Sequence, residues 1–278
     1  MNPSQAYSTS ILSLISSLVK NFRLIQQMAK REVIGRYRGS MAGLIWSFLN
    51  PLLMLVIYTF VFSVVFKARW GGAAGSSESK ADFAIVLFVG LIIHTVFAEC
   101  INRAPVLILS NTSYVKKVIF PLEALPWIVL GSALFHATVS IVVLLIVQLA
   151  LGHSVPWTAI FFPVILVPLI FTIMGFSFAL AALGVYVRDI SQVTTTFTSI
   201  LFFISPIVYP LSSLPPNFQI WMKLSPLTFI IEEGRKALIY GQIPDMEQWC
   251  VAMALGLIIA WMGFVVFQKM RKGFADVL

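Results

Sequence analysis

Long apolar runs alternate with short polar connections along most of the chain. Each run approaches the roughly 20 apolar residues that a helix needs to cross about 30 Å of hydrocarbon. The pattern predicts an all-α integral membrane protein with six transmembrane helices, at residues 44–66, 83–102, 124–151, 158–187, 192–210 and 248–268. Six crossings return the chain to its starting side, so we expect both termini on one face of the membrane.

The segment before the first run has a helical rather than a uniform pattern. At about 100° per residue, apolar positions fall on one arc and basic or amide positions on the opposite one. The apolar arc holds Leu18, Phe22, Ile25, Ala29 and Val33. This predicts an amphipathic interfacial helix within an N-terminal region, 1–43, held at the inner surface by apolar burial and by anionic headgroups. A simple topology anchor is the plainer interpretation.

Two features mark the entry into the first span. Gly35, Gly39 and Gly43 recur every four residues, which permits close helix approach but is also typical of hinge and cap positions. Asn50-Pro51 lies near the start of the span, and a proline inside a helix removes a backbone hydrogen bond. We therefore expect a kink between Trp46 and Asn50.

Residues 211–244, between the fifth and sixth spans, are too apolar for a free loop and too rich in proline for a span. Ser225-Pro226 is typical of an N-cap followed by the first helical residue. The pattern predicts a helix from Leu227 to Ile239 that buries Phe229, Ile230 and Leu238. Irregular backbone at membrane depth needs protein or a water-filled cavity around it, which favours re-entrant gate helices at an outer mouth.

Composition and charge agree with a membrane protein. The 278 residues are 59% hydrophobic and 11% charged, against about a quarter charged in a globular domain. Most of the 19 lysines and arginines flank the side that holds the termini, which predicts cytoplasmic termini. This asymmetry accounts for the net charge of +8 without nucleic-acid binding. The expected division is a six-span domain, 44–270, and a cytoplasmic tail, 271–278.

The cytoplasmic connection 104–121 has an ordered pattern. A short apolar piece is followed by a polar break at Asn111 and then by Tyr114, Lys116 and Lys117. Such a segment suits a short helix presented to a soluble partner, and an ordinary basic loop is the alternative.

Little in the sequence suggests chemistry on the chain itself. The sequence contains no G-x-x-x-x-G-K-[ST] phosphate loop and no cluster of His, Cys or carboxylates with metal spacing. Glu99 and Arg103 are four residues apart, so we expect them to pair along one helix. Isolated histidines on apolar faces, such as His94 and His136, are more often hydrogen-bonded core residues than ligands.

Three separated motifs carry a family resemblance that covers nearly the whole chain in order. They are "RYRGSMAGLIWSFLNPLLMLVIYTFVFSVVF" up to Phe66, "NTSYVKKVIFP" from Asn111, and "SPIVYPLSSLP" with "LSPLTFIIEEGRKALIYGQIP" up to Pro244. The chain resembles the membrane subunit of ABC-type polysaccharide exporters of Gram-negative bacteria, the group that exports lipid-linked O antigen. Ser225 departs from the asparagine expected before Pro226, although either side chain can cap a helix.

The resemblance implies a permease subunit, not an enzyme, in the bacterial inner membrane. It implies a homodimer with two copies of a separate ATPase subunit, which binds ATP and Mg and contacts segment 104–121 through Asn111, Tyr114, Lys116 and Lys117. The cargo would be an undecaprenyl-diphosphate-linked polysaccharide, O antigen above all, moved to the periplasm. Pro226, Phe229 and Arg235 would belong to the gate.

Aromatic side chains in spans one and five are candidates for the sugar path, because the C–H faces of sugars slide over rings. They are Trp46, Tyr58, Phe62, Phe197, Phe202 and Tyr209. Lipid-facing or interfacial positions are the ordinary alternative for each. The polar run 191–199 of span five predicts contact with the dimer interface or the path, with plain hydrogen bonding between helices as the alternative.

Other functions remain open on the sequence. The same architecture could export capsule, teichoic acid or a small hydrophobic compound. A membrane enzyme acting on lipid-linked sugars would have only Glu99, His94 and His136 as acid–base groups. An ion-coupled secondary transporter is disfavoured because no carboxylate lies in the middle of a span and no inverted repeat is evident.

Overall fold

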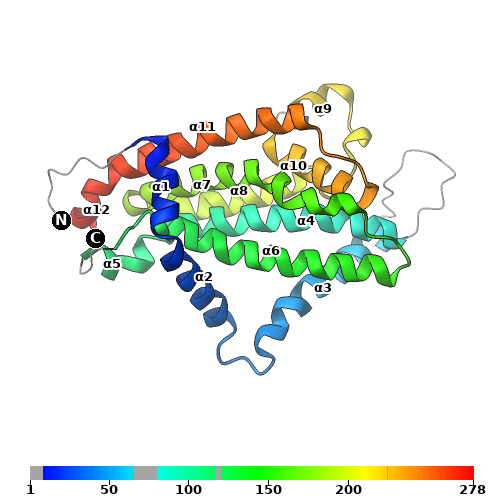
Figure 1. Ribbon diagram of the computed structural model, residues 1–278, viewed down its shortest axis with the longest axis horizontal. Coiled ribbons are helices and arrows are strands. Elements are labelled where there is room, and N and C mark those ends of the chain that lie inside the picture. The colour runs from blue at the N-terminus through cyan, green and yellow to red at the C-terminus, as the bar shows by residue number, and fades with distance from the viewer. Residues whose placement is uncertain (1–8, 66–79, 117–119, 224) are drawn as a thin grey trace.

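The computed structural model describes residues 9–65, 80–116, 120–223 and 225–278, and in these ranges the regular structure is helical (Figure 1). The longer helices are α2 (Phe22–Tyr37), α3 (Trp46–Tyr58), α4 (Lys80–Arg103), α6 (Ala124–Ala150), α7 (Phe162–Tyr186), α8 (Ile190–Ile204) and α11 (Met246–Met270). The shorter ones are α1 (Ile11–Lys20), α5 (Thr112–Lys116), α9 (Pro216–Lys223), α10 (Pro226–Arg235) and α12 (Phe274–Val277). The all-α prediction is confirmed for these residues.

Five helical segments of the described residues are long and apolar enough to cross a membrane. They are Gly43–Val61, Asp82–Val106, Ala124–Ala150, Trp157–Tyr186 and Met246–Val277. They overlap the spans expected at 44–66, 83–102, 124–151, 158–187 and 248–268. The chain is therefore an integral membrane protein by the length and composition of its helices.

The fifth expected span is shorter than the sequence indicated. Helix α8 has 15 residues and ends at Ile204, so the expected end at residue 210 is wrong. Ser205 is extended (φ −68°, ψ 151°) because it precedes Pro206, and a residue before proline avoids the α conformation. At 1.5 Å per residue α8 covers about 22 Å, less than the hydrocarbon core. Six full spans therefore stay a prediction.

Helix α4 forms the centre of the bundle. Nearly all of its apolar segment is buried, and it contacts α6, α7, α8 and α10, whereas the first span is mostly exposed. Helices α7 and α11 pack most closely, because a Cβ added at Gly263 would lie 1.8 Å from the carbonyl oxygen of Gly175. Small residues allow such approach between membrane helices.

The N-terminal region consists of two helices rather than one continuous amphipathic helix. Asn21 separates α1 from α2, and its side-chain amide donates to the Ser17 carbonyl oxygen at 2.9 Å. Ile25, Ala29 and Val33 are buried, and α2 packs on α6, where a Cβ at Gly131 would lie 3.0 Å from that of Ala29. The apolar face of α2 is thus largely covered by protein and not by lipid.

The bend between α2 and α3 relies on glycine conformation. Gly39 (φ +86°) and Gly43 (φ +52°) adopt the left-handed region, and no atom lies within 4 Å of a Cβ added at either. The hinge interpretation is therefore confirmed for Gly39 and Gly43, and neither glycine packs closely against another described part of this chain. Pro51 lies inside α3, which follows a 3₁₀ turn at Gly43–Ile45. The kink expected between Trp46 and Asn50 stays a prediction.

The two ends of the bundle differ in their elements. Helices α5 and α12 lie at one end, and α9 and α10 lie at the other (Figure 1). The first end carries segment 104–121, expected at the cytoplasm, and the second carries segment 211–244, expected outside. The orientation in the membrane stays a prediction, and we refer to these as the coupling end and the gate end.

Candidate functional site

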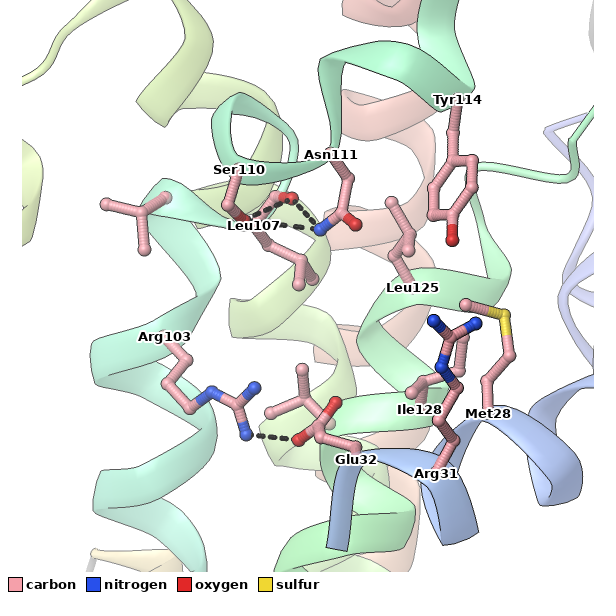
Figure 2. A pocket seen from close by; sticks show the side chains of 12 residues that line it. Met28, Arg31, Glu32, Arg103, Leu107, Ser110, Asn111, Tyr114, Leu125 and Ile128 are labelled. Carbon is pink, nitrogen blue, oxygen red and sulfur yellow. Dashed lines mark hydrogen bonds and ion pairs between the residues drawn. The ribbon is translucent and has the colours of Figure 1, made fainter. Parts of the chain in front are cut away.

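A polar cavity of about 290 Å³ lies at the coupling end, between α2, α6 and the turns after α4. Figure 2 shows Tyr114 and Arg31 with their polar ends directed into it from opposite sides. Its walls are Met28, Arg31, Glu32, Arg103, Val106, Leu107, Ser110, Asn111, Tyr114, Leu125, Ile128 and Val129. Two of the residues expected to contact an ATPase, Asn111 and Tyr114, therefore share one cavity with charged residues of α2.

Local contacts fix both of these side chains. The Asn111 amide donates to the Leu107 carbonyl oxygen at 2.9 Å and to the Ser110 hydroxyl at 3.2 Å. The Tyr114 ring stacks on Phe120, with 4.5 Å between ring centroids and 14° between planes. The side chain of Lys116 and the whole of Lys117 lie outside the described residues. The structure thus gives a short helix, α5, where the sequence indicated one.

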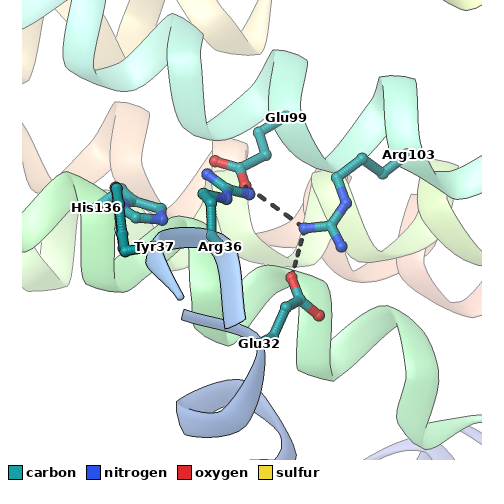
Figure 3. A network of polar contacts seen from close by, with 6 residues as sticks. All are labelled: Glu32, Arg36, Tyr37, Glu99, Arg103 and His136. Carbon is teal, nitrogen blue, oxygen red and sulfur yellow. Dashed lines mark hydrogen bonds and ion pairs between the residues drawn. The ribbon is translucent and has the colours of Figure 1, made fainter. Parts of the chain in front are cut away.

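A charge network joins α2 to the end of α4 beside this cavity (Figure 3). Arg36 pairs with Glu99, and Arg103 pairs with Glu32 at 2.5 Å and with Glu99 at 3.5 Å. The expected pairing of Glu99 with Arg103 is confirmed. Two carboxylates face two guanidinium groups, so the network is electrically balanced and holds α2 against α4.

Tyr37 extends this network to α6. Its hydroxyl lies 3.4 Å from His136 Nδ1. Partial burial raises the pKa of the Tyr37 phenol, so the hydroxyl keeps its proton at neutral pH and can donate to the imidazole. Helix α2 is therefore held by polar contacts to both α4 and α6 in addition to its apolar face.

The aromatic candidates for the sugar path fall into separate groups. The Tyr58 and Phe202 rings lie 6.0 Å apart, and Phe202 lies 5.3 Å from the His94 ring, so spans one and five meet through rings. Trp46 and Phe197 are both more than a third exposed, and neither has a ring contact among the described side chains. The side chain of Phe62 lies outside the described residues.

Tyr209, the last aromatic candidate, forms hydrogen bonds with the C-terminal end of α8. Its hydroxyl donates to the carbonyl oxygens of Ile204, at 2.5 Å, and Phe203, at 3.1 Å. The single hydroxyl proton is shared between these two carbonyl groups, which the helix end leaves without backbone partners. A structural role explains this residue without a sugar path.

The polar run of α8 is satisfied mainly within its own helix. Thr194, Thr195, Thr196 and Ser199 donate to carbonyl oxygens three or four residues earlier. Thr198 also reaches another helix, since its hydroxyl donates to Asn102 Oδ1 at 3.1 Å. A hydroxyl bonded to its own backbone can face lipid, protein or a water-filled path at little cost. The dimer-interface assignment of this run stays a prediction.

The described residues of the gate segment include α9, which the sequence did not indicate, and the helix that was expected after Ser225. Helix α10 begins at Pro226 after Ser225, although the Ser225 side chain makes no capping hydrogen bond. The chain continues as a π-helix, Lys236–Tyr240, so the expected helix over 227–239 is confirmed. Ile230 and Leu238 are buried, and Phe229 is half-buried. The re-entrant placement stays a prediction.

Arg235 is fully buried, which the sequence did not indicate. Its Nε donates to the Val86 carbonyl oxygen at 3.1 Å, its Nη2 to that of Ile207 at 3.0 Å, and its Nη1 to Glu232 Oε1 at 2.8 Å. Burial lowers the pKa of the guanidinium to about 10, although the negative charge of Glu232 raises it in part. Arg235 therefore stays charged at neutral pH. Arg235 thus joins the gate to α4 and to the break after α8.

The three acid–base groups of the enzyme hypothesis make structural polar contacts, and two of them, Glu99 and His136, belong to the network around Arg36 and Tyr37 (Figure 3). Glu99 is neutralised by two arginines, His136 contacts Tyr37, and His94 Nε2 lies 3.0 Å from the Thr198 carbonyl oxygen. Each group already has a partner, and no cluster of three potential metal ligands occurs among the described residues.

Sequence reasoning missed the roles of Glu32 and Arg36. The helical pattern assigned neither residue a contact, and at 100° per residue Arg36 falls on the apolar arc and Glu32 at its edge. One signal was available, because Glu32 is the single carboxylate in an otherwise basic helix. Its partner Arg103 is 71 residues away, a distance that no local pattern can bridge.

Comparison with known proteins agrees with this architecture. Residues 23–239 match the family model described as ABC-2 type transporter. The chain is 27% identical to the O-antigen export system permease protein RfbA of Myxococcus xanthus, covering 96% of this chain and 99% of that protein. It is 24% identical to a protein of the same name from Klebsiella pneumoniae, covering 92% and 95%. It is 22% identical to the polysialic acid transport protein KpsM of Escherichia coli, covering 89% and 93%. The chain therefore belongs to the ABC-2 type transporter family of membrane proteins.

Proposed function

We propose that the chain is the membrane permease subunit of an ATP-driven polysaccharide exporter in a bacterial inner membrane. The observation that carries the proposal is end-to-end similarity to an O-antigen export permease, with 99% of that relative covered. The alignment therefore includes the residues of the coupling and gate segments of this chain as well as those of its spans.

The cargo that we propose is an undecaprenyl-diphosphate-linked polysaccharide, O antigen in the first instance, moved from the cytoplasm to the periplasm. The pair of neighbouring rings of Tyr58 and Phe202 supports a path between spans one and five, because aromatic rings offer weak, repeated contacts to sugar faces. Weak contacts suit a chain that must slide rather than stay bound.

A homodimer would complete the path. The first span is mostly exposed, and α8 exposes Val193, Phe197 and Ile200 together with the hydroxyl groups of Thr195, Thr196 and Ser199. Two copies facing each other through these helices would enclose a channel lined by rings and hydroxyls. Two ATPase subunits, which bind ATP and Mg, would dock at the coupling ends.

Coupling would proceed through the cavity at Asn111 and Tyr114. ATP bound by the partner subunits can open a path only if it favours one arrangement of the permease through different contacts in the two states. The cavity and the charge network connect segment 104–121 to α2, and α2 leads directly into the first span. A displacement of α5 therefore has a short route to the path.

The test combines copurification with glycan export. We expect an ATPase subunit to copurify with the permease from its host, and replacement of Lys116→Ala with Lys117→Ala to abolish export of the surface glycan. The matched control is Lys269→Ala with Lys272→Ala, which removes two charges near α12. Transport without nucleotide and without a partner would refute the proposal, as would crosslinking that places the ATPase far from residues 111–117.

Capsule export is the second candidate, favoured by 22% identity to the capsule polysaccharide export inner-membrane protein CtrC of Neisseria meningitidis over 94% of the chain. The two cargoes differ in the glycan that accumulates inside the cell when the gene is deleted. O antigen on its lipid carrier supports the first proposal, and capsular polymer supports the second.

A further inference from the structure

A second polar cavity, of about 300 Å³, lies at the gate end and away from the proposed path. Three chain segments meet there: the first turn of α4, the turn that ends α6, and the π-helix of the gate. The lining residues are Asp82, Ile85, Val86, Gln148, His153, Ser154, Ile239 and Tyr240. Its volume lies at the lower end of the range for small-molecule sites.

Gln148 is one of the lining residues and holds a buried acceptor without a partner in the described part of the chain. Its side chain is 2% exposed, and its Nε2 donates to the Leu238 carbonyl oxygen at 3.1 Å. Because that partner is an acceptor, the amide must turn its nitrogen toward Leu238 and its oxygen away. The oxygen, Oε1, is buried and finds no hydrogen-bond partner among the described residues. A buried acceptor without a partner is costly, so a donor from a ligand or from water is expected there.

The turn after α6 places further polar groups around the same cavity. Gly152 adopts φ +82°, and the His153 amide donates to the Gln148 carbonyl oxygen at 3.0 Å, which folds the chain back over the helix end. His153 Nε2 then lies 2.9 Å from Asp82 on α4. The half-exposed ring of Tyr240 forms the gate side, opposite the apolar surface of Ile85 and Val86.

We infer that this cavity is a subsite for one pyranose residue of a saccharide at the gate end. Sugar hydroxyl groups can donate to Gln148 Oε1 and to the carboxylate of Asp82, and the C–H face of a sugar ring can pack on Tyr240 or on the aliphatic wall. The mixture of acceptors, an aromatic ring and apolar side chains matches a molecule that is polar at its edges and apolar on its faces. The inference rests on the proposed function only for the source of the sugar.

Other ligand classes fit the cavity less well. A hard cation needs six or more oxygen ligands at about 2.3–2.6 Å, whereas this cavity offers one carboxylate, which already pairs with His153. An anion would meet the carboxylate of Asp82 and the oxygen of Gln148. Apolar compounds would leave Gln148 Oε1 without a donor.

Binding at this position would act on the gate. The cavity wall includes Ile239 and Tyr240 of the π-helix, while α4 and α6 form the rest. The same π-helix is held by Gln148 and by the Thr158 hydroxyl, which donates to the Ala237 carbonyl oxygen at 2.7 Å. A sugar in the subsite therefore contacts both the bundle and the gate.

The test measures binding of free pyranoses to the purified permease in nanodiscs by saturation-transfer NMR. The probes are glucose, galactose, mannose, rhamnose and N-acetylglucosamine. We expect at least one of them to bind, and Gln148→Met to weaken it about three- to tenfold, the effect of one lost hydrogen bond. Tyr240→Leu, which leaves Gln148 and its bond to Leu238 intact, should weaken it similarly.

Trp221→Leu is the matched control, because Trp221 is an aromatic residue of α9 that is 74% exposed and lies outside the cavity wall. Binding by none of the sugars would mean that water alone fills the cavity, and equal binding by the parent, Gln148→Met and Tyr240→Leu proteins would locate the sugar elsewhere. Either result overturns the inference. The measurement needs neither ATP nor an ATPase, so its outcome is separate from that of the export test.

Discussion

Arg235→Met should destabilise the permease more than any exposed charge replacement. Methionine fills a similar volume with an unbranched apolar chain, so the change removes the three hydrogen bonds of the guanidinium with little cavity formation. Two carbonyl oxygens, of Val86 and Ile207, lose their donor, and Glu232 loses its cation. The perturbation thus isolates the polar contacts of the gate.

The magnitude follows from these contacts. A buried group left without its partner costs about 1–3 kcal/mol, and breaking a buried ion pair by removing one partner costs about 3–5 kcal/mol. Glu232 is about a third exposed, which lowers its share. We expect a loss of roughly 3–5 kcal/mol, and at about 2–4 °C per kcal/mol this lowers the melting temperature by roughly 6–20 °C.

Thermal unfolding in detergent, followed by tryptophan fluorescence, measures the shift at constant protein and detergent concentrations. Arg235→Lys should lie between the parent and Arg235→Met, because one ammonium cannot reach three acceptors in fixed directions. Arg188→Met, at the exposed turn after α7, is the control and should change little. A melting temperature for Arg235→Met within 2 °C of the control, a margin of about 1 kcal/mol or less, would refute the reasoning.

Three further changes test other parts of the structure. Gly263→Ala should lower the free energy of unfolding by about 1–3 kcal/mol, because the new methyl group meets the Gly175 backbone. Gly35→Ala should instead stabilise α2 by about 0.5–1 kcal/mol. Thermal unfolding distinguishes the two variants, and equal shifts in melting temperature would contradict this packing. Glu99→Gln should increase hydrogen exchange across α2, measured against Glu247→Gln, and unchanged exchange would show that the charge network does not hold α2. Tyr114→Ala should reduce glycan export while Tyr114→Phe, which keeps the ring stack, should not; full export by Tyr114→Ala would exclude the stack from coupling.

Hydropathy predicted most of the spans because apolar length is a local property of the sequence. It failed at the end of α8, where Ser205-Pro206 stops the helix inside a run that remains apolar. Proline geometry, not hydropathy, decides that boundary. The Ser205-Pro206 pair is visible in the sequence, but the apolar residues on both sides of it extended the predicted span to residue 210.

Local sequence patterns could not predict contacts between helices that are far apart in the sequence. The glycines spaced by four at positions 35, 39 and 43 offered close packing as one interpretation, yet the close approach occurs between Gly175 and Gly263. Arg235 was placed in the gate, but an arginine is almost never fully buried unless paired, so its burial was not foreseen. Asn111 and Tyr114 were predicted as contacts for an ATPase, which stays a prediction, and the presence of Glu32 in the same cavity was not foreseen.

Helix α2 is the element through which the coupling end can act on the first span. One face lines the cavity beneath Asn111 and Tyr114, another is packed on α6, and the charge network holds it to α4. The chain then turns at Gly39 and Gly43 into α3, which is mostly exposed although it also contacts α6 and α4. Moving α2 away from α4 would break ion pairs that are partly buried. A displacement of the coupling end that keeps these pairs must therefore move α2 and the end of α4 together, and the glycine bend joins that unit to α3.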